Sequence, residues 1–242
     1  MRRLSVETNY SPFKYGYYFH LLYIIMPIAY FLAHSILEQS YKEIEFTMNM
    51  VQIEFEKSIP YLSFMSVLFF VMIAVAATLF VFLAIKDVCA FKRYMIFLFI
   101  GLFICVLAAA GFPNYNTLLP NIQDDNSFFG SLMKIIVGYD SNINNFPSTT
   151  TIVAASIVYA AFDSKKLNYK WIKIVSIVLA VLFIASSIFI KRNSLYDILG
   201  AGIICGIMLI PINLIKRRDM LKIGEERIKR DEENGWTPTK FY

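Results

Sequence analysis

Residues 61–85 read YLSFMSVLFFVMIAVAATLFVFLAI, an apolar run without a single charged side chain. At 1.5 Å per residue, a helix of about 20 such residues crosses the roughly 30 Å of hydrocarbon in a bilayer. The run is apolar throughout and carries no polar stripe, which is typical of a helix surrounded by lipid and protein. This segment therefore predicts a membrane protein.

Similar apolar runs recur along the chain, which is 57% hydrophobic and has a mean hydropathy of +0.56. We expect an all-α fold, a polytopic membrane protein with six transmembrane helices. The predicted spans are residues 17–37, 61–85, 94–112, 149–163, 172–190 and 195–215. Residues 17–215 then form one membrane domain between a short lead (1–16) and a charged tail (216–242), with a long loop at 113–147.

The distribution of Lys and Arg predicts the orientation of these spans. If the N-terminus is cytoplasmic, 18 of the 23 basic residues and 9 of the 18 acidic residues fall on the inner side. The inner side then carries a net charge of +9 and the outer side −4, which follows the positive-inside rule for a plasma-membrane protein with both termini cytoplasmic. The net charge of +5 is explained by topology and anionic lipid, so we expect no nucleic-acid partner.

Composition and spacing indicate neither a metal nor another cofactor. No His, Asp or Glu residues have the spacing of metal ligands, and no glycine-rich phosphate loop is present. The three cysteines lie in or beside three different spans, which favours plain packing over a disulfide framework.

Two short polar motifs stand at the ends of predicted spans on the outer side. The first is Asn145-Phe146-Pro147-Ser148-Thr149-Thr150, at the start of the fourth span. The second runs from Ser186-Ser187 through Asn193 to Asp197, across the turn between the last two spans.

Both motifs resemble those of the type 2 phosphatidic acid phosphatase (PAP2) superfamily, in its bacterial branch related to inositol phosphorylceramide synthases. That family reads Pro-Ser-x-His in the first motif and Ser/Thr-Arg-x5-His-x3-Asp in the second. The resemblance implies a six-helix PAP2-like bundle that works without metal on lipid phosphates. It also implies a phosphate site facing outward.

The resemblance assigns roles to the matching positions, and most of them carry other residue types here. Ser148 and Asp197 match, whereas Asn193 replaces the histidine nucleophile and Thr150 replaces the histidine acid. The positions that resemble the phosphate-binding Lys and Arg residues are Phe112, Leu119 and Ser187.

These replacements remove the chemistry of the resembled enzymes. An Asn amide cannot form a phosphoenzyme, and Thr does not titrate near neutral pH. Lys191 and Arg192 remain as basic residues that either bind a lipid phosphate or extend to the headgroups. We treat His34, near the outer end of the first span, as a structural residue.

Three functions remain open at this point. The first is a catalytically lapsed PAP2-like protein that binds lipid or a partner, with a phosphorylated lipid, another protein or a second copy of the chain as candidates. The second is an active lipid-phosphate phosphatase or phosphotransferase with rearranged groups. The third is an unrelated six-span structural or transport protein in which the motifs are coincidental.

Three smaller features complete the expectations. Residues 38–60 mix acidic and apolar side chains, as in an interfacial helix or an amphipathic connector. Residues 127–138 predict a short helix inside the long loop. Gly202 and Gly206, four residues apart, predict close helix packing within the monomer ahead of a dimer contact.

Overall fold

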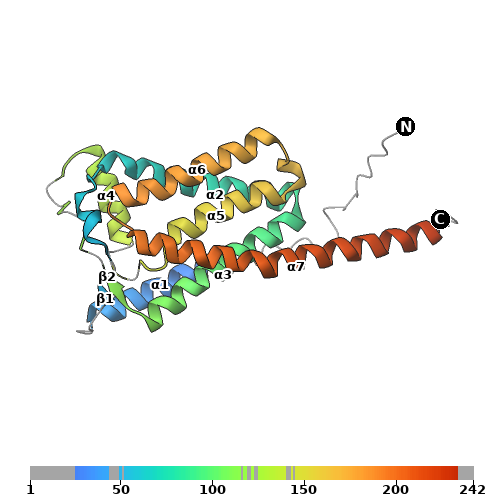
Figure 1. Ribbon diagram of the computed structural model, residues 1–242, viewed down its shortest axis with the longest axis horizontal. Coiled ribbons are helices and arrows are strands. Elements are labelled where there is room, and N and C mark those ends of the chain that lie inside the picture. The colour runs from blue at the N-terminus through green and yellow to red at the C-terminus, as the bar shows by residue number, and fades with distance from the viewer. Residues whose placement is uncertain are drawn as a thin grey trace.

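The computed structural model describes residues 25–43, 49–50, 52–115, 117–118, 121–122, 125–139, 143 and 145–233. Within these residues the chain is mostly helical (Figure 1). The α-helices are α1 (Ile25–Glu43), α2 (Ser66–Lys86), α3 (Val88–Gly111), α4 (Phe128–Tyr139), α5 (Thr149–Asp163), α6 (Lys170–Phe189) and α7 (Leu195–Glu233). Three 3-10 helices, η2 (Glu54–Ser58), η3 (Ser63–Met65) and η4 (Lys165–Leu167), and two short parallel strands, β1 (Asn49–Met50) and β2 (Asn114–Tyr115), complete the fold.

Four of the helical segments are long and apolar enough to cross a membrane, and they correspond to four of the six predicted spans. They are Ser63–Lys86, Val88–Gly111, Lys170–Phe189 and Leu195–Arg218. The predicted span at 149–163 is α5, which has 15 residues and a length of roughly 22 Å. The predicted span at 17–37 lies partly outside the described residues, and its described part belongs to α1.

The surfaces of these helices are suited to lipid. Of the most apolar part of Ser63–Lys86, only 11% is buried within the protein. The corresponding share for α3 is 39%. Large apolar side chains such as Val81, Ile177 and Ile203 are correspondingly exposed. Exposed apolar area on this scale is rare on monomeric proteins in water, which is compatible with a membrane protein whose four long apolar helices face lipid.

Helix α5 is the central helix, packed against α2, α3, α6 and α7. Its Ile152 is fully buried and fills the space over Gly101 of α3, where an added Cβ would stand 2.5 Å from the Ile152 Cγ2 atom. A glycine at this position therefore lets α3 and α5 approach closely.

Gly202 and Gly206 do not have the packing role within the monomer that the sequence predicted. Both are exposed, and a Cβ added at either would meet nothing within 4 Å. The close approach on α7 is instead at Gly200, where a Cβ would stand 2.5 Å from the Phe146 ring. Spacing alone could not tell which face of α7 turns toward the bundle.

The two ends of the bundle differ (Figure 1). At one end, which we call the loop end, α4, the two strands and the α6–α7 turn (residues 190–194) gather. At the other, the tail end, α5 and α6 are joined by residues 164–169, and α7 continues beyond the bundle as one helix to Glu233. The predicted helix at 127–138 is confirmed as α4. The stretch at 38–60 is not one continuous helix in its described part: residues 38–43 end α1, 49–50 form β1 and 54–58 form η2.

An ionic cluster ties three helices together at the tail end. The Asp163 carboxylate of α5 is 2.7 Å from Arg93 Nε of α3 and 2.7 Å from Lys216 Nζ of α7. The Asp163 side chain is 2% exposed, so its charge is stabilised by these two cations and not by water. Asp87 adds a second link, since its carboxylate accepts hydrogen bonds from Ala90 N at the start of α3 and from Ser164 Oγ.

Candidate functional site

The two polar motifs meet at the loop end of the bundle. Asn193 Nδ2, in the α6–α7 turn, donates a hydrogen bond of 2.9 Å to Ser148 Oγ, 45 residues earlier in the chain. The Ser148 N–H donates to the Asp197 carbonyl at 3.0 Å. Asn193 is 2% exposed and Ser148 is fully buried, so the contact is closed to solvent.

Ser148 is the N-cap of α5, which accounts for its position. Its hydroxyl accepts hydrogen bonds from Thr151 N at 3.1 Å and from Thr151 Oγ1 at 3.0 Å. A serine at an N-cap satisfies one of the donors that the first turn of a helix leaves open. Thr151, and not the predicted Thr150, is thus the threonine that contacts Ser148; Thr150 is buried nearby in the chain, and its Oγ1 has no hydrogen-bond partner among the described residues.

The α6–α7 turn has the hydrogen bonds of a Schellman motif. Lys191 N donates to Ile188 O and Arg192 N donates to Ser187 O, both at 3.0 Å, and Asn193 N also reaches Ser187 O at 3.2 Å. Lys191 takes the left-handed conformation, φ 60°, in the place where this motif usually has glycine. The turn thereby directs the Asn193 side chain back toward α5.

Asp197 helps to cap the N-terminus of α7. Its Oδ2 accepts from Ser194 N at 2.7 Å, and Ser194 Oγ accepts from Tyr196 N at 3.1 Å. Asp197 is 1% exposed, and its Oδ1 has no hydrogen-bond partner among the described residues. Sequence reasoning predicted Asp197 as an orienting group, whereas its observed contacts are those of a helix cap.

Glu56 belongs to the same group of buried polar residues, which we call the cluster (Glu56, Ser148, Lys191, Arg192, Asn193, Ser194 and Asp197). The sequence did not predict that Glu56 belongs to it. This η2 residue is 1% exposed, and its Oε1 accepts hydrogen bonds from Ser194 Oγ at 3.1 Å and from Leu195 N. Its Oε2 accepts from Ile53 N at 2.9 Å. The sequence showed Glu56 among other acidic residues of a connector, with no signal that it alone turns inward.

Lys191 and Arg192 are each 5% exposed, so neither extends outward to headgroups in this structure. Lys191 Nζ donates to the backbone carbonyl of Glu56, and the Arg192 guanidinium lies 4.8 Å from the centre of the Phe69 ring. Burial lowers the pKa of Lys191, and the Glu56 carboxylate opposes that shift.

The other predicted binding residues lie elsewhere or outside the described part. The Ser187 hydroxyl donates to Ile184 O on its own helix, so its carbonyl and not its side chain serves the turn. Phe112 is exposed, with its ring 6.1 Å from that of Phe146, and Leu119 lies outside the described residues. His34 packs against the Tyr30 ring in α1, with 5.6 Å between ring centres.

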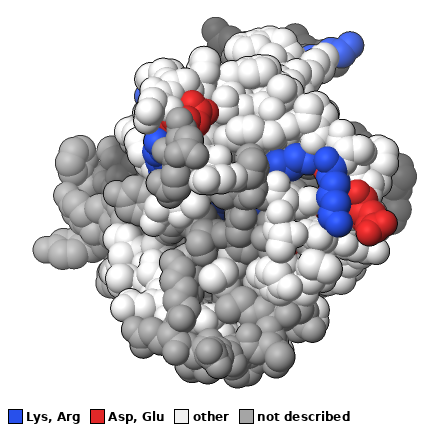
Figure 2. Space-filling model, turned by 90° about the vertical axis from the view of Figure 1, so that its left-hand side faces the viewer, with Lys and Arg blue, Asp and Glu red and all other residues white. Residues whose placement is uncertain are grey.

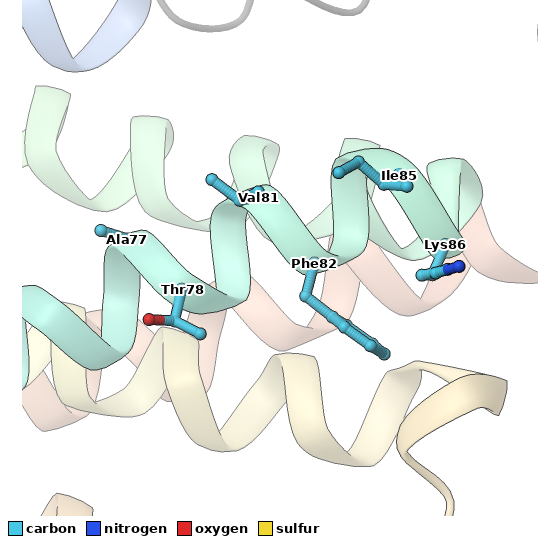
Figure 3. Close-up of a pocket in the computed structure, with 6 residues that line it drawn as sticks. All are labelled: Ala77, Thr78, Val81, Phe82, Ile85 and Lys86. Atoms are coloured by element: carbon cyan, nitrogen blue, oxygen red, sulfur yellow. The ribbon is translucent and has the colours of Figure 1, made fainter.

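The loop-end face carries only separate small patches of basic and acidic side chains among its coloured residues (Figure 2). The charged groups of the cluster are inside the protein, under this face. A hollow of about 540 Å³ lies along α2 and is lined by Ala77, Thr78, Val81, Phe82, Ile85 and Lys86 (Figure 3). It approaches the tail end of α2 and contains none of the cluster residues.

Among the described residues, no group of three or more His, Cys, Asp or Glu side chains is placed to hold a metal ion. Comparisons with protein-family models, with curated proteins and with solved structures found no match. The chemistry of the cluster therefore rests on its own contacts. It holds hydroxyls, amides, two cations and two carboxylates, and in the part of the chain that the structure describes no base is hydrogen-bonded to Ser148 Oγ.

Proposed function

We propose that this chain is a six-span protein of the plasma membrane, PAP2-like in fold, whose catalytic site has lapsed into a binding site for a phosphorylated lipid or for a partner. Both termini are cytoplasmic and the loop end faces outward. The hydrogen bond between Asn193 and Ser148 supports this most directly, because it joins the two motifs that resemble one active site. A coincidental pair of motifs would have no reason to converge.

The contacts of Ser148 favour a lapsed enzyme over an active one. A serine nucleophile needs a base that takes its proton. Here the Ser148 oxygen accepts from an amide and from Thr151, and neither group is a base. We therefore expect no turnover of lipid phosphates.

The test is phosphate release from a diacylglycerol phosphate and from a polyprenyl phosphate by the purified protein. We expect none from the wild type or from Asn193→His. Nucleophile, acid and phosphate clamp act as a unit, so a single repair leaves the others missing. A combined Leu119→Arg, Thr150→His, Ser187→Arg and Asn193→His variant tests whether the unit can be rebuilt.

Glu54→Gln serves as the control for surface changes, since the Glu54 side chain is 97% exposed. Wild-type turnover that disappears in Ser148→Ala or His34→Ala would overturn the proposal. That result would identify a rearranged enzyme.

A further inference from the structure

The segment 52–62 reverses the usual pattern of burial. Glu56 is 1% exposed, whereas the adjacent Phe55 is 68% exposed. Glu56 is the only buried residue among residues 52–62. A carboxylate is costly to remove from water unless it gains strong partners. The fold of this segment therefore delivers an anion, and not a phenyl ring, to the interior.

The Glu56 carboxylate occupies the N-terminus of α7. It accepts hydrogen bonds from Ser194 Oγ, the N-cap side chain, and from the N–H of Leu195, the first residue of the helix. The free N–H groups and the dipole at a helix N-terminus favour an anion at this position. Lys191 Nζ approaches from the preceding turn and donates to the Glu56 carbonyl.

Two buried basic residues lie in the turn beside this carboxylate. Lys191 and Arg192 are each 5% exposed, and Lys191 Nζ contacts the Glu56 carbonyl. Withdrawal of the Glu56 carboxylate would remove negative charge from the α7 N-terminus, which favours binding of an external anion there.

A second observation points to the kind of anion. Asp197 lies on the first turn of the same helix, and its buried Oδ1 has no donor among the described residues. A phosphate monoester with one proton has oxygens that could accept from Ser194, Leu195 and Lys191 in place of Glu56. Its remaining P–OH group would supply the donor for Asp197 Oδ1.

We infer that Glu56 is an internal plug in a phosphate site, and that residues 53–61 withdraw when a phosphate monoester binds. The segment is held at both ends: Gln52 Oε1 accepts from Thr117 N and Oγ1, and Leu62 N donates to Phe189 O. Movement between these anchors would expose the α7 N-terminus while the bundle stays intact. The inference rests on the proposed binding function, for which it names the ligand chemistry and the regulation.

The experiment measures binding of inorganic phosphate and of dihexanoyl phosphatidic acid to the full-length protein in detergent micelles. Glu56→Gln keeps the size and one acceptor oxygen but removes the charge. We expect it to bind a phosphate monoester at least about tenfold more tightly than the wild type. Glu54→Gln, on the same 3-10 helix with an exposed side chain, should match the wild type. Glu56→Asp, which keeps the charge, should also show no gain.

The two ligands separate the two sources of the phosphate group. A gain for both identifies a site for the phosphate group itself, and a gain for phosphatidic acid alone identifies a lipid headgroup site. Equal binding by the wild type, Glu54→Gln and Glu56→Gln would overturn the inference.

Hydrogen exchange on the wild type covers the case in which Glu56→Gln does not fold. Phosphatidic acid should speed exchange of backbone amides at 53–61 relative to phosphatidylcholine of the same chain length, and an equal rate would overturn the inference. If Glu56→Gln binds phosphate no more tightly and no lipid phosphate is hydrolysed, the plug is wrong and the proposed function stands. If lipid phosphates are hydrolysed and Glu56→Gln binds phosphate more tightly, the loss of catalysis is refuted and the plug stands.

Discussion

Lys191 combines an unfavourable backbone with a favourable side chain. Its φ of 60° lies in the left-handed region, where a Cβ costs roughly 1–2 kcal/mol, while its ammonium donates to the Glu56 carbonyl. The residue thus links the α6–α7 turn to the 52–62 segment. The two contributions can be separated by substitution.

We predict that Lys191→Gly is more stable than Lys191→Ala by about 0.5–1 kcal/mol. Both lose the ammonium, but glycine relieves the left-handed strain, and this gain exceeds the greater freedom that glycine has in the unfolded chain. Thermal unfolding of the purified variants in detergent micelles measures the difference. The reverse order would mean that the turn does not hold this conformation.

At the scale of elements, glycine allows close helix packing at Gly101, where two helices touch, and not at the pair Gly202 and Gly206, which are four residues apart. Gly101 faces the buried Ile152 across the α3–α5 contact, whereas Gly206 faces open space. The space available to a Cβ differs between the two positions, although both are interior helix residues.

We predict that Gly101→Ala destabilises the protein by about 1–3 kcal/mol through overpacking. Gly206→Ala should leave stability unchanged or raise it by up to about 1 kcal/mol, because alanine favours the helix. Unfolding of the two variants side by side tests this. Similar losses in both would indicate that α7 packs through Gly206, for instance in a dimer.

The tail-end cluster allows a second prediction at this scale. Asp163→Asn removes the carboxylate that pairs with the buried Arg93 and should cost about 3 kcal/mol or more. Lys216→Gln should cost less than about 1 kcal/mol, because the Lys216 side chain is 42% exposed and its pairing with Asp163 is screened by solvent. Equal losses in the two variants would show that Lys216 contributes as much as Arg93.

For the whole molecule, the two clusters lie at opposite ends of one bundle, and the charge distribution predicts which end is outside. Thiol labelling of intact cells tests the orientation, with the exposed Cys89 first changed to serine. A membrane-impermeant reagent should label a cysteine at exposed position 126 of the long loop and miss one at exposed position 166. The opposite pattern would invert the topology and place the Glu56 cluster on the cytoplasmic side.

The membrane character, the bounds of most apolar helices and the helix inside the long loop could all be predicted from the amino-acid sequence. Continuous apolar runs and turn residues are local signals, and burial in lipid requires no particular neighbour. It also placed Asn193 and Ser148 at the same end of the bundle, since both stand at the ends of spans on one side. Their contact depends in addition on the packing of α5 against α6 and α7.

The other contacts of the cluster depend on how distant segments pack together and could not be predicted from the sequence. Glu56 comes from a connector with several acidic residues, and its burial depends on the docking of η2 against the start of α7. Thr151, and not Thr150, contacts Ser148 because of the N-cap geometry of α5. Gly202 and Gly206 lack contacts within 4 Å of an added Cβ because of the rotation of α7 about its axis. Each of these is set by how elements far apart in the chain are oriented, because rotation about a helix axis and long-range docking leave no periodic trace in a single sequence.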